Sequence, residues 1–108
     1  NGLGLCTASF SQHRPRIVSD GVGGAIVTWY DERTTTTTPD IYAQRIDASG
    51  TPLWMSNGVV VSNSGRTEDY PTIYPDGASG AFITAAMAAP MPMRMYMVGS
   101  EANSGSNN

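Results

Sequence analysis

Residues 15–33 read PRIVSDGVGGAIVTWYDER, and this stretch decides the fold. Its first residues are typical of a short strand, and the Asp-Gly and Gly-Gly pairs of residues 20–24 indicate a hairpin connection. Residues 25–31 carry apolar side chains at both alternating sets of positions. A strand with one face in water would alternate apolar and polar residues, so we expect this strand to be covered on both sides.

The same pattern returns 56 residues later, where residues 71–84 read PTIYPDGASGAFIT. Residues 1–28 and 57–84 align without a gap and share nine identities, concentrated on Gly, Pro and Asp-Gly, which fix backbone turns. Apolar residues also coincide, as for Leu3 with Val59 and Leu5 with Val61. We therefore predict a first β repeat at residues 1–56, the start of a second at residues 57–86, and an irregular, flexible tail at residues 87–108.

Each repeat is predicted to hold four short antiparallel strands. After the hairpin, residues 40–47 (DIYAQRID) alternate as a third strand. Residues 53–54 and 58–62 supply a fourth, which the repeat also places at residues 2–5. Four strands in a repeat of this length are typical of a propeller blade. The expected fold is all-β, with two propeller-blade-like repeats of which the second is incomplete, and the alternative is a small β-sandwich built from the two repeats.

Composition and charge exclude several classes of partner. The 108 residues include six Arg, no Lys, six Asp and three Glu, for a net charge of −3. Phosphate neutralisation needs a basic surface, so we expect no nucleic-acid partner. No apolar run approaches the roughly 20 residues that span a bilayer, so we expect no membrane partner. With one cysteine, Cys6, and one histidine, His13, one chain can form neither an internal disulfide nor a Cys-based or two-His metal site.

The chain resembles a tandem propeller-like β repeat of large secreted bacterial proteins, with the pattern PxIxxDGxGGAIVxWxDxR, then DIYAQRIDxxGxxLW, then GVxV. The match covers the first repeat fully and the second only to Thr84. The pattern is carried by Pro15, Ile17, Asp20, Gly21, residues 23–27, Trp29, Asp31, Arg33, residues 40–47, Gly50, Leu53, Trp54 and residues 58–61. The resemblance implies an extracellular or cell-surface module, and it carries no catalytic residue to transfer.

Several carboxylates are candidate ligands or catalysts. The Asp-Gly pairs at 20–21 and 76–77 offer Ca²⁺ ligands, but no D-x-[DN]-x-[DN]-G loop is present and we favour simple turns. Residues 31–33 (DER) offer an acid pair beside an arginine, but we favour a solvated strand end with a local Asp–Arg contact. Asp40 and Asp47 bracket one strand, which places them too far apart for a glycosidase pair.

The remaining candidates are weaker. His13 has no Ser or Cys partner at a recognisable motif, and Cys6 is interpreted as a small core residue of an apolar strand. The five Thr of residues 34–38 offer hydroxyls to a ligand or sites for O-linked sugar, but they are more typical of a flexible loop. A sugar platform, with carbohydrate as a candidate partner, is offered by four aromatics that are more typical of a β core: Trp29, Tyr30, Tyr42 and Trp54. We expect no catalytic, cofactor-binding or metal-binding residue.

After Thr84 the second repeat departs from the pattern, and residues 85–98 read AAMAAPMPMRMYMV. Because Met has a single codon, the −1 reading frame is partly legible, and it is compatible with D-A-D-A-D-V-Y-G, which resembles residues 40–43. One hypothesis is that the chain left its ancestral frame between Thr84 and Met91. The other is a divergent native terminus or a cloning scar, and the gene sequence distinguishes the two.

Three functions fit these features. The first is a non-enzymatic extracellular repeat module with a structural, adhesive or ligand-binding role, cut from a larger array. The second is a fragment of a secreted carbohydrate-active hydrolase, and the third is an orphan cassette-type small protein of unknown function. The sequence shows no His, Cys or carboxylate constellation, which favours the first. Because a blade buries its faces against its neighbours, the expected partners are neighbouring repeats or a second copy through self-association.

Overall fold

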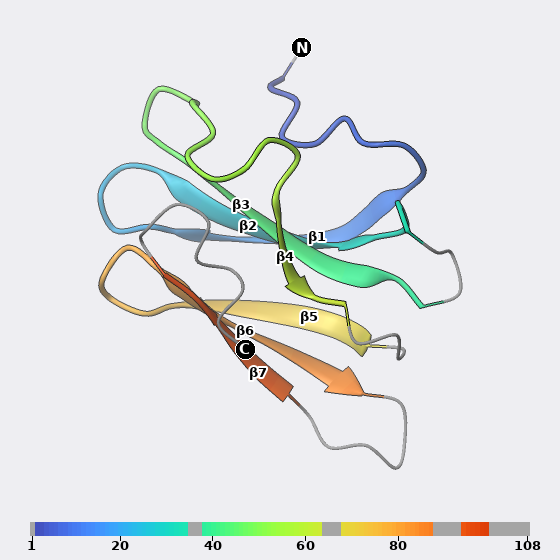
Figure 1. Ribbon diagram of the computed structural model, residues 1–108. Coiled ribbons are helices and arrows are strands. Elements are labelled where there is room, and N and C mark those ends of the chain that lie inside the picture. The colour runs from blue at the N-terminus through green and yellow to red at the C-terminus, as the bar shows by residue number, and fades with distance from the viewer. Residues whose placement is uncertain (1, 35–37, 64–67, 88–93, 100–108) are drawn as a thin grey trace.

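Seven β-strands make up the computed structural model of the chain (Figure 1). The structure describes all residues except 1, 35–37, 64–67, 88–93 and 100–108. The strands are β1 (Gln12–Ser19), β2 (Ala25–Asp31), β3 (Asp40–Ile46), β4 (Val59–Ser62), β5 (Glu68–Pro75), β6 (Ala81–Met87) and β7 (Arg94–Val98). The described residues contain no helix, and so none long and apolar enough to cross a membrane.

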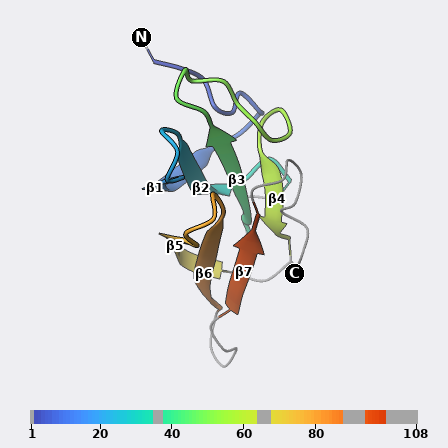
Figure 2. The ribbon, with the colours of Figure 1, turned by 90° about the vertical axis from the view of Figure 1, so that its left-hand side faces the viewer.

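The strands form two antiparallel sheets, and the first sheet takes its outer strand, β4, from the start of the second repeat. β1–β4 pair in chain order as a four-stranded sheet, and β5–β7 pair in chain order as a three-stranded sheet. The two sheets lie face to face as two layers (Figure 2). The prediction of an all-β fold made of antiparallel sheets is therefore confirmed. The first sheet has four strands, but its fourth, β4, lies beyond the predicted end of the first repeat at residue 56.

The second repeat reproduces the hairpin of the first in bounds and register. β5 and β6 begin and end 56 residues after β1 and β2. Ile17 lies opposite Val27 in the first hairpin, and Ile73 lies opposite Ile83 in the second. Both hairpins shift register at the same position of the repeat. The sequence identities therefore correspond to one backbone geometry that occurs twice.

The hairpin turn explains why Asp and Gly recur at fixed positions. Oδ1 of Asp20 accepts the N–H groups of residues 22 and 24 at 2.9 and 2.8 Å, and Oδ1 of Asp76 accepts those of residues 78 and 80 at 2.7 and 2.9 Å. A Cβ on Gly24 would lie 2.1 Å from a carbonyl oxygen of β3, and a Cβ on Gly80 would lie 2.5 Å from one of β7. Any side chain at these two positions would clash with the third strand, so only glycine fits.

The repeat makes it possible to compare the faces of the two sheets. In β2, Ile26 points to one side of the sheet and Val27 to the other, and these sides are called the Ile26 face and the Val27 face. Phe82 and Ile83 hold the equivalent positions in β6 and define the Phe82 face and the Ile83 face.

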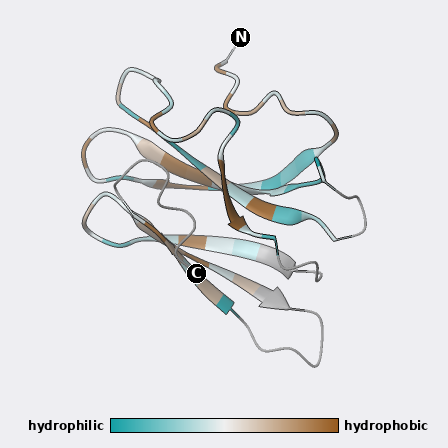
Figure 3. Cartoon of the chain, viewed as in Figure 1, coloured by the Kyte–Doolittle hydropathy of each residue, from teal (hydrophilic) through white to brown (hydrophobic). Residues whose placement is uncertain are grey.

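Unlike faces meet in the core. The Ile26 face of the first sheet packs on the Ile83 face of the second, whereas a two-fold sandwich would bring equivalent faces together. Figure 3 shows that β4, the outer strand of the first sheet, is mostly apolar. The core residues of the first sheet are Ile26, Tyr30, Ile41, Ala43, Val59 and Val61, and those of the second are Ile73, Ala81, Ile83, Ala85, Tyr96 and Val98.

Two predictions about the strands are wrong. Residues 2–5 and 53–54 form no strand, although Pro52 makes an isolated bridge to Ile46. The prediction of an irregular tail is wrong over Arg94–Val98, which form β7. Tyr96 and Val98 are buried while Met95 and Met97 are exposed, so residues 94–98 show the period-two pattern of a strand with one buried face. Residues 88–93 and 100–108 of the predicted tail lie outside the described residues.

Candidate functional site

The Val27 face of the first sheet carries the densest group of polar and aromatic contacts. Trp29 and Asp31 share this face because they are two residues apart on β2, and Tyr42 lies opposite Trp29 on β3. Their rings stack with centroids 6.5 Å apart. Arg33 follows the end of β2, where the chain turns back over the same face. We call Trp29, Asp31, Arg33 and Tyr42 the Trp29 cluster.

Asp31 is the centre of the Trp29 cluster, and none of its surface is exposed. Its Oδ2 accepts a hydrogen bond from Trp29 Nε1 at 2.9 Å and one from Arg33 Nη2 at 2.6 Å. Its Oδ1 accepts from the backbone N–H and from Nε of Arg33, at 2.9 and 2.8 Å. The carboxylate thus has a bidentate arginine and an indole as partners, which is a strong, geometrically specific arrangement.

Arg33 links this face to two other segments of the chain. Its Cζ lies 3.8 Å from the centroid of the Tyr42 ring, within the range of a cation–π contact. Its Nη2 donates to the carbonyl oxygen of Asn57 at 2.8 Å and lies 3.2 Å from Cys6 Sγ. Arg33, the last residue of the W-x-D-x-R motif, therefore connects the end of β2 to the N-terminal segment and to the loop before β4.

Ionisation in the cluster follows from these contacts. Burial alone would raise the pKa of Asp31, but the hydrogen bonds from Arg33 and Trp29 outweigh burial and lower it. The hydrogen bond to Asp31 raises the pKa of Arg33. Burial raises the pKa of Tyr42. The pair is therefore charged and the phenol neutral at pH 7. The prediction of a local Asp–Arg contact is confirmed, but the prediction that this strand end is solvated is wrong.

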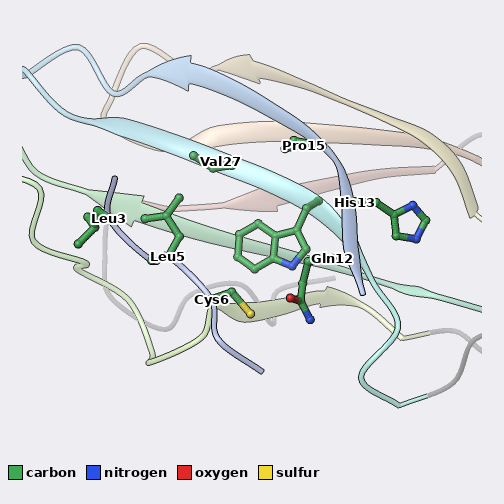
Figure 4. Close-up of a pocket in the computed structure, with 9 residues that line it drawn as sticks. Leu3, Leu5, Cys6, Gln12, His13, Pro15 and Val27 are labelled. Carbon is green, nitrogen blue, oxygen red and sulfur yellow. The ribbon is translucent and has the colours of Figure 1, made fainter. Parts of the chain in front are cut away.

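A cavity of about 340 Å³ opens beside the cluster. Residues 3–6 line one side of the cavity, with Leu5 and Cys6 beside it (Figure 4), and Val27 and Trp29 of β2 also line it. The other wall comes from β1, through Gln12, His13 and Pro15. The lining is predominantly apolar, which favours an apolar group as its occupant.

The aspartates of the two hairpins and of the loop after β3 stabilise turns. Hydrogen bonds from the backbone of Val22 lower the pKa of Asp20, which also accepts Nε of Arg45 at 3.1 Å. Asp47 accepts the backbone N–H of Thr51 at 2.9 Å, and this bond lowers its pKa. Asp20 thus acts in the turn that the sequence predicts, and Asp47 stabilises a turn in which no role was predicted for it. No three His, Cys, Asp or Glu side chains come together in the part of the chain that the structure describes.

His13 and Cys6 lie on opposite sides of the cavity and have different partners. His13 Nε2 lies 3.1 Å from Glu32 Oε2, and its ring packs edge-on against Tyr30. Cys6 is half-buried in a segment without regular structure, so its interpretation as a residue of an apolar strand is wrong. Its contact is with Arg33, which the sequence does not reveal because the two residues are 27 positions apart.

Asp40 is the first residue of β3 and Asp47 follows its last, so the two lie at opposite ends of the strand, as the sequence predicts. The register adds a pair that sequence reasoning missed, because Asp40 lies directly opposite Asp31 on β2, and both are buried. A cross-strand pair depends on the register of β2 and β3, and this register cannot be deduced from the sequence.

The candidate aromatic platform, which the sequence favours less than a β core, does not form an exposed surface. Trp29, Tyr30 and Trp54 are buried, and Tyr42 lies under Arg33. Of the threonine run, residues 35–37 lie outside the described residues. No family model, curated protein or solved structure matches the chain.

Proposed function

We propose that this chain is a non-enzymatic extracellular repeat module of a propeller-like array, with a structural or adhesive role. The observation that carries this proposal is the packing of unlike faces. If equivalent faces packed together, the two outer faces of the sandwich would also be equivalent to each other. Because unlike faces pack here, the two outer faces are the Val27 face and the Phe82 face, which differ in the same way as the two faces that meet in the core. Such a stack extends by adding further units in the same way. The resemblance to repeats of large secreted bacterial proteins agrees with this arrangement.

The use of the carboxylates supports a non-enzymatic role. Asp31 is neutralised by Arg33, while Asp20 and Asp47 hold turns together. A general acid needs a carboxyl whose pKa is raised toward neutrality, but the pKa of each of these three is lowered. Their chemistry is that of structural groups.

A panel of chromogenic glycosides together with a glycan array tests the proposal. We expect no hydrolysis, and a glycan that binds would identify the adhesive ligand. The matched variants are Asp31→Asn and Asp40→Asn, which alter the two carboxylates that face each other across β2 and β3. Hydrolysis that either variant abolishes would contradict the proposal and favour a fragment of a carbohydrate-active hydrolase.

A further inference from the structure

The Phe82 face of the second sheet is an uncovered apolar surface. Tyr74, Met95 and Met97 are 55, 60 and 49 % exposed, and Phe82 lies between them. The remaining described side chains of this face are threonines, so it carries no charge there. Its counterpart in the first repeat, the Ile26 face, is buried on the second sheet. The same surface thus has a partner in one repeat, whereas in the other no sheet of the described residues covers it.

At the other end of the stack, residues 3–6 lie on the Val27 face and form one wall of the cavity (Figure 4). Among the described residues, their backbone has no hydrogen-bond partner. The segment is held instead by Thr7, whose N–H donates to Asn57 Oδ1 at 2.9 Å, and by the contact of Cys6 with Arg33. The segment has no regular structure, and the chain bends at Leu5.

The repeat shows what residues 3–6 correspond to. Leu3 and Leu5 are the equivalents of Val59 and Val61, which belong to β4 and are buried between the two sheets. β4 covers the Ile83 face of the second sheet as the outer strand of a four-stranded sheet. Residues 3–6 pack against the Val27 face of the first sheet, just as β4 packs against the equivalent Ile83 face of the second. In the first sheet three further strands, β1–β3, accompany β4. No described strand accompanies residues 3–6 in this way, and the cavity opens beside them.

We propose that a second copy of this chain fills that place with its β5–β7 sheet. The Phe82 face of the second copy packs on the Val27 face of the first, which repeats between chains the contact of unlike faces that exists within one chain. Residues 3–6 then add to the outer side of β7 of the second copy as the fourth strand, next to the last strand of its described sheet. Both partners are incomplete alone, and each supplies what the other lacks.

The register of this strand addition follows from the existing sheet. Val59 lies opposite Ala43 in the first repeat, and Ala43 lies opposite Thr28. Met95 lies opposite Thr84, the equivalent of Thr28, so Met95 is the counterpart of Ala43. Leu3 of one copy is therefore expected opposite Met95 of the next. The contact joins two different surfaces, so it extends head to tail until a ring closes or a filament forms.

This proposal rests on the unlike-face packing of the proposed function, and solution mass tests it separately from any glycan or glycoside result. Light scattering coupled to size exclusion, from micromolar to millimolar chain, is expected to show dimers or larger species. Met97→Arg places a charge in the centre of the Phe82 face and should weaken association by at least about tenfold. Val22→Arg is the matched control, because Val22 is 65 % exposed in the first hairpin turn. A monomer at every concentration, or equal association of Met97→Arg and the wild type, would overturn the proposal.

A cysteine pair tests the register itself. In a Cys6→Ser background, Leu3→Cys with Met95→Cys is expected to give disulfide-linked dimers and higher species on a non-reducing gel, because opposed residues of antiparallel strands have a Cα spacing suited to a disulfide. The two positions lie at opposite ends of the stack (Figure 1), so they cannot pair within one chain. Val22→Cys with Met95→Cys is the control. Linking no more efficient than in that control would overturn the strand pairing.

Discussion

Replacing Arg33 with Met removes the counter-ion of a fully buried carboxylate. Asp31 would lose the side-chain hydrogen bonds at 2.8 and 2.6 Å and keep those from Trp29 Nε1 and the backbone of residue 33. Breaking a buried ion pair by removing one partner costs about 3–5 kcal/mol. The Arg33 side chain is 20 % exposed, so water screens part of the interaction, and we take the lower end, about 3 kcal/mol. That is a large part of the roughly 5–15 kcal/mol that stabilises a small domain.

A double-mutant cycle shows whether the pair acts as a unit. Asp31→Asn removes the charge and keeps one acceptor oxygen, so we expect it to cost about 2 kcal/mol. The double variant lacks both the Asp31 carboxylate and its counter-ion, so neither charge of the pair is left without the other. Its destabilisation should fall short of the sum of the single variants by at least about 1 kcal/mol.

Urea unfolding at pH 7, followed by tryptophan fluorescence, measures all four free energies of unfolding. Arg94→Met is the control, because Arg94 is an exposed arginine on β7, and it should stay within about 0.5 kcal/mol of the wild type. A cost below about 1 kcal/mol for Arg33→Met, or strict additivity in the double variant, would refute the reasoning.

Three further results are expected. Gly58→Ala should cost about 3 kcal/mol by urea unfolding, because its φ is +96° and a Cβ would lie 2.8 Å from the indole of Trp29, whereas Gly77→Ala, with φ +81° and open space, should cost about 1 kcal/mol; equal costs would contradict the indole contact. Because the pKa of Asp31 is lower in the folded state than its unfolded value of 3.8, its ionised form stabilises the fold above that value, and this stabilisation is lost as the pH falls. The free energy of unfolding, followed by circular dichroism, should therefore be constant near pH 6 and decline below about pH 4, and a protein more stable in acid would contradict this. Tyr96→Phe removes the acceptor of a 3.0 Å hydrogen bond from Ser62 between the sheets and should lower the free energy of unfolding by about 1 kcal/mol, a loss that an unchanged urea midpoint would rule out.

The hairpins were the most predictable part of the fold, because their geometry is set by local backbone chemistry. The Asp-Gly turn needs an oxygen that accepts two nearby N–H groups and a glycine where a Cβ would strike the third strand. Both requirements appear in residues 20–24 and again 56 residues later. The strand Arg94–Val98 was not predicted, because residues 95–98 are all apolar or aromatic and the chain departs there from the repeat pattern.

The Trp29 cluster was only partly predictable. The spacing of Trp29, Asp31 and Arg33 indicated a local contact, but Asp31 proved to be buried beneath segments that lie far away in the sequence. The contacts of Arg33 with Cys6 and Asn57 span 27 and 24 positions. Long-range contacts of this kind follow from the path of loops over a sheet, and no local pattern encodes that path.

The sequence by itself determined the repeat, the all-β class and the turn chemistry, because these depend on side-chain alternation and on residues that only certain backbone angles accept. Tertiary structure alone decided which faces meet. In the first repeat both faces of β2 are apolar, so periodicity could not say which of them would pack on the second sheet. Packing placed Ile26 against the second sheet and left Val27 beneath residues 3–6, because burial depends on the area that two whole surfaces remove from water together.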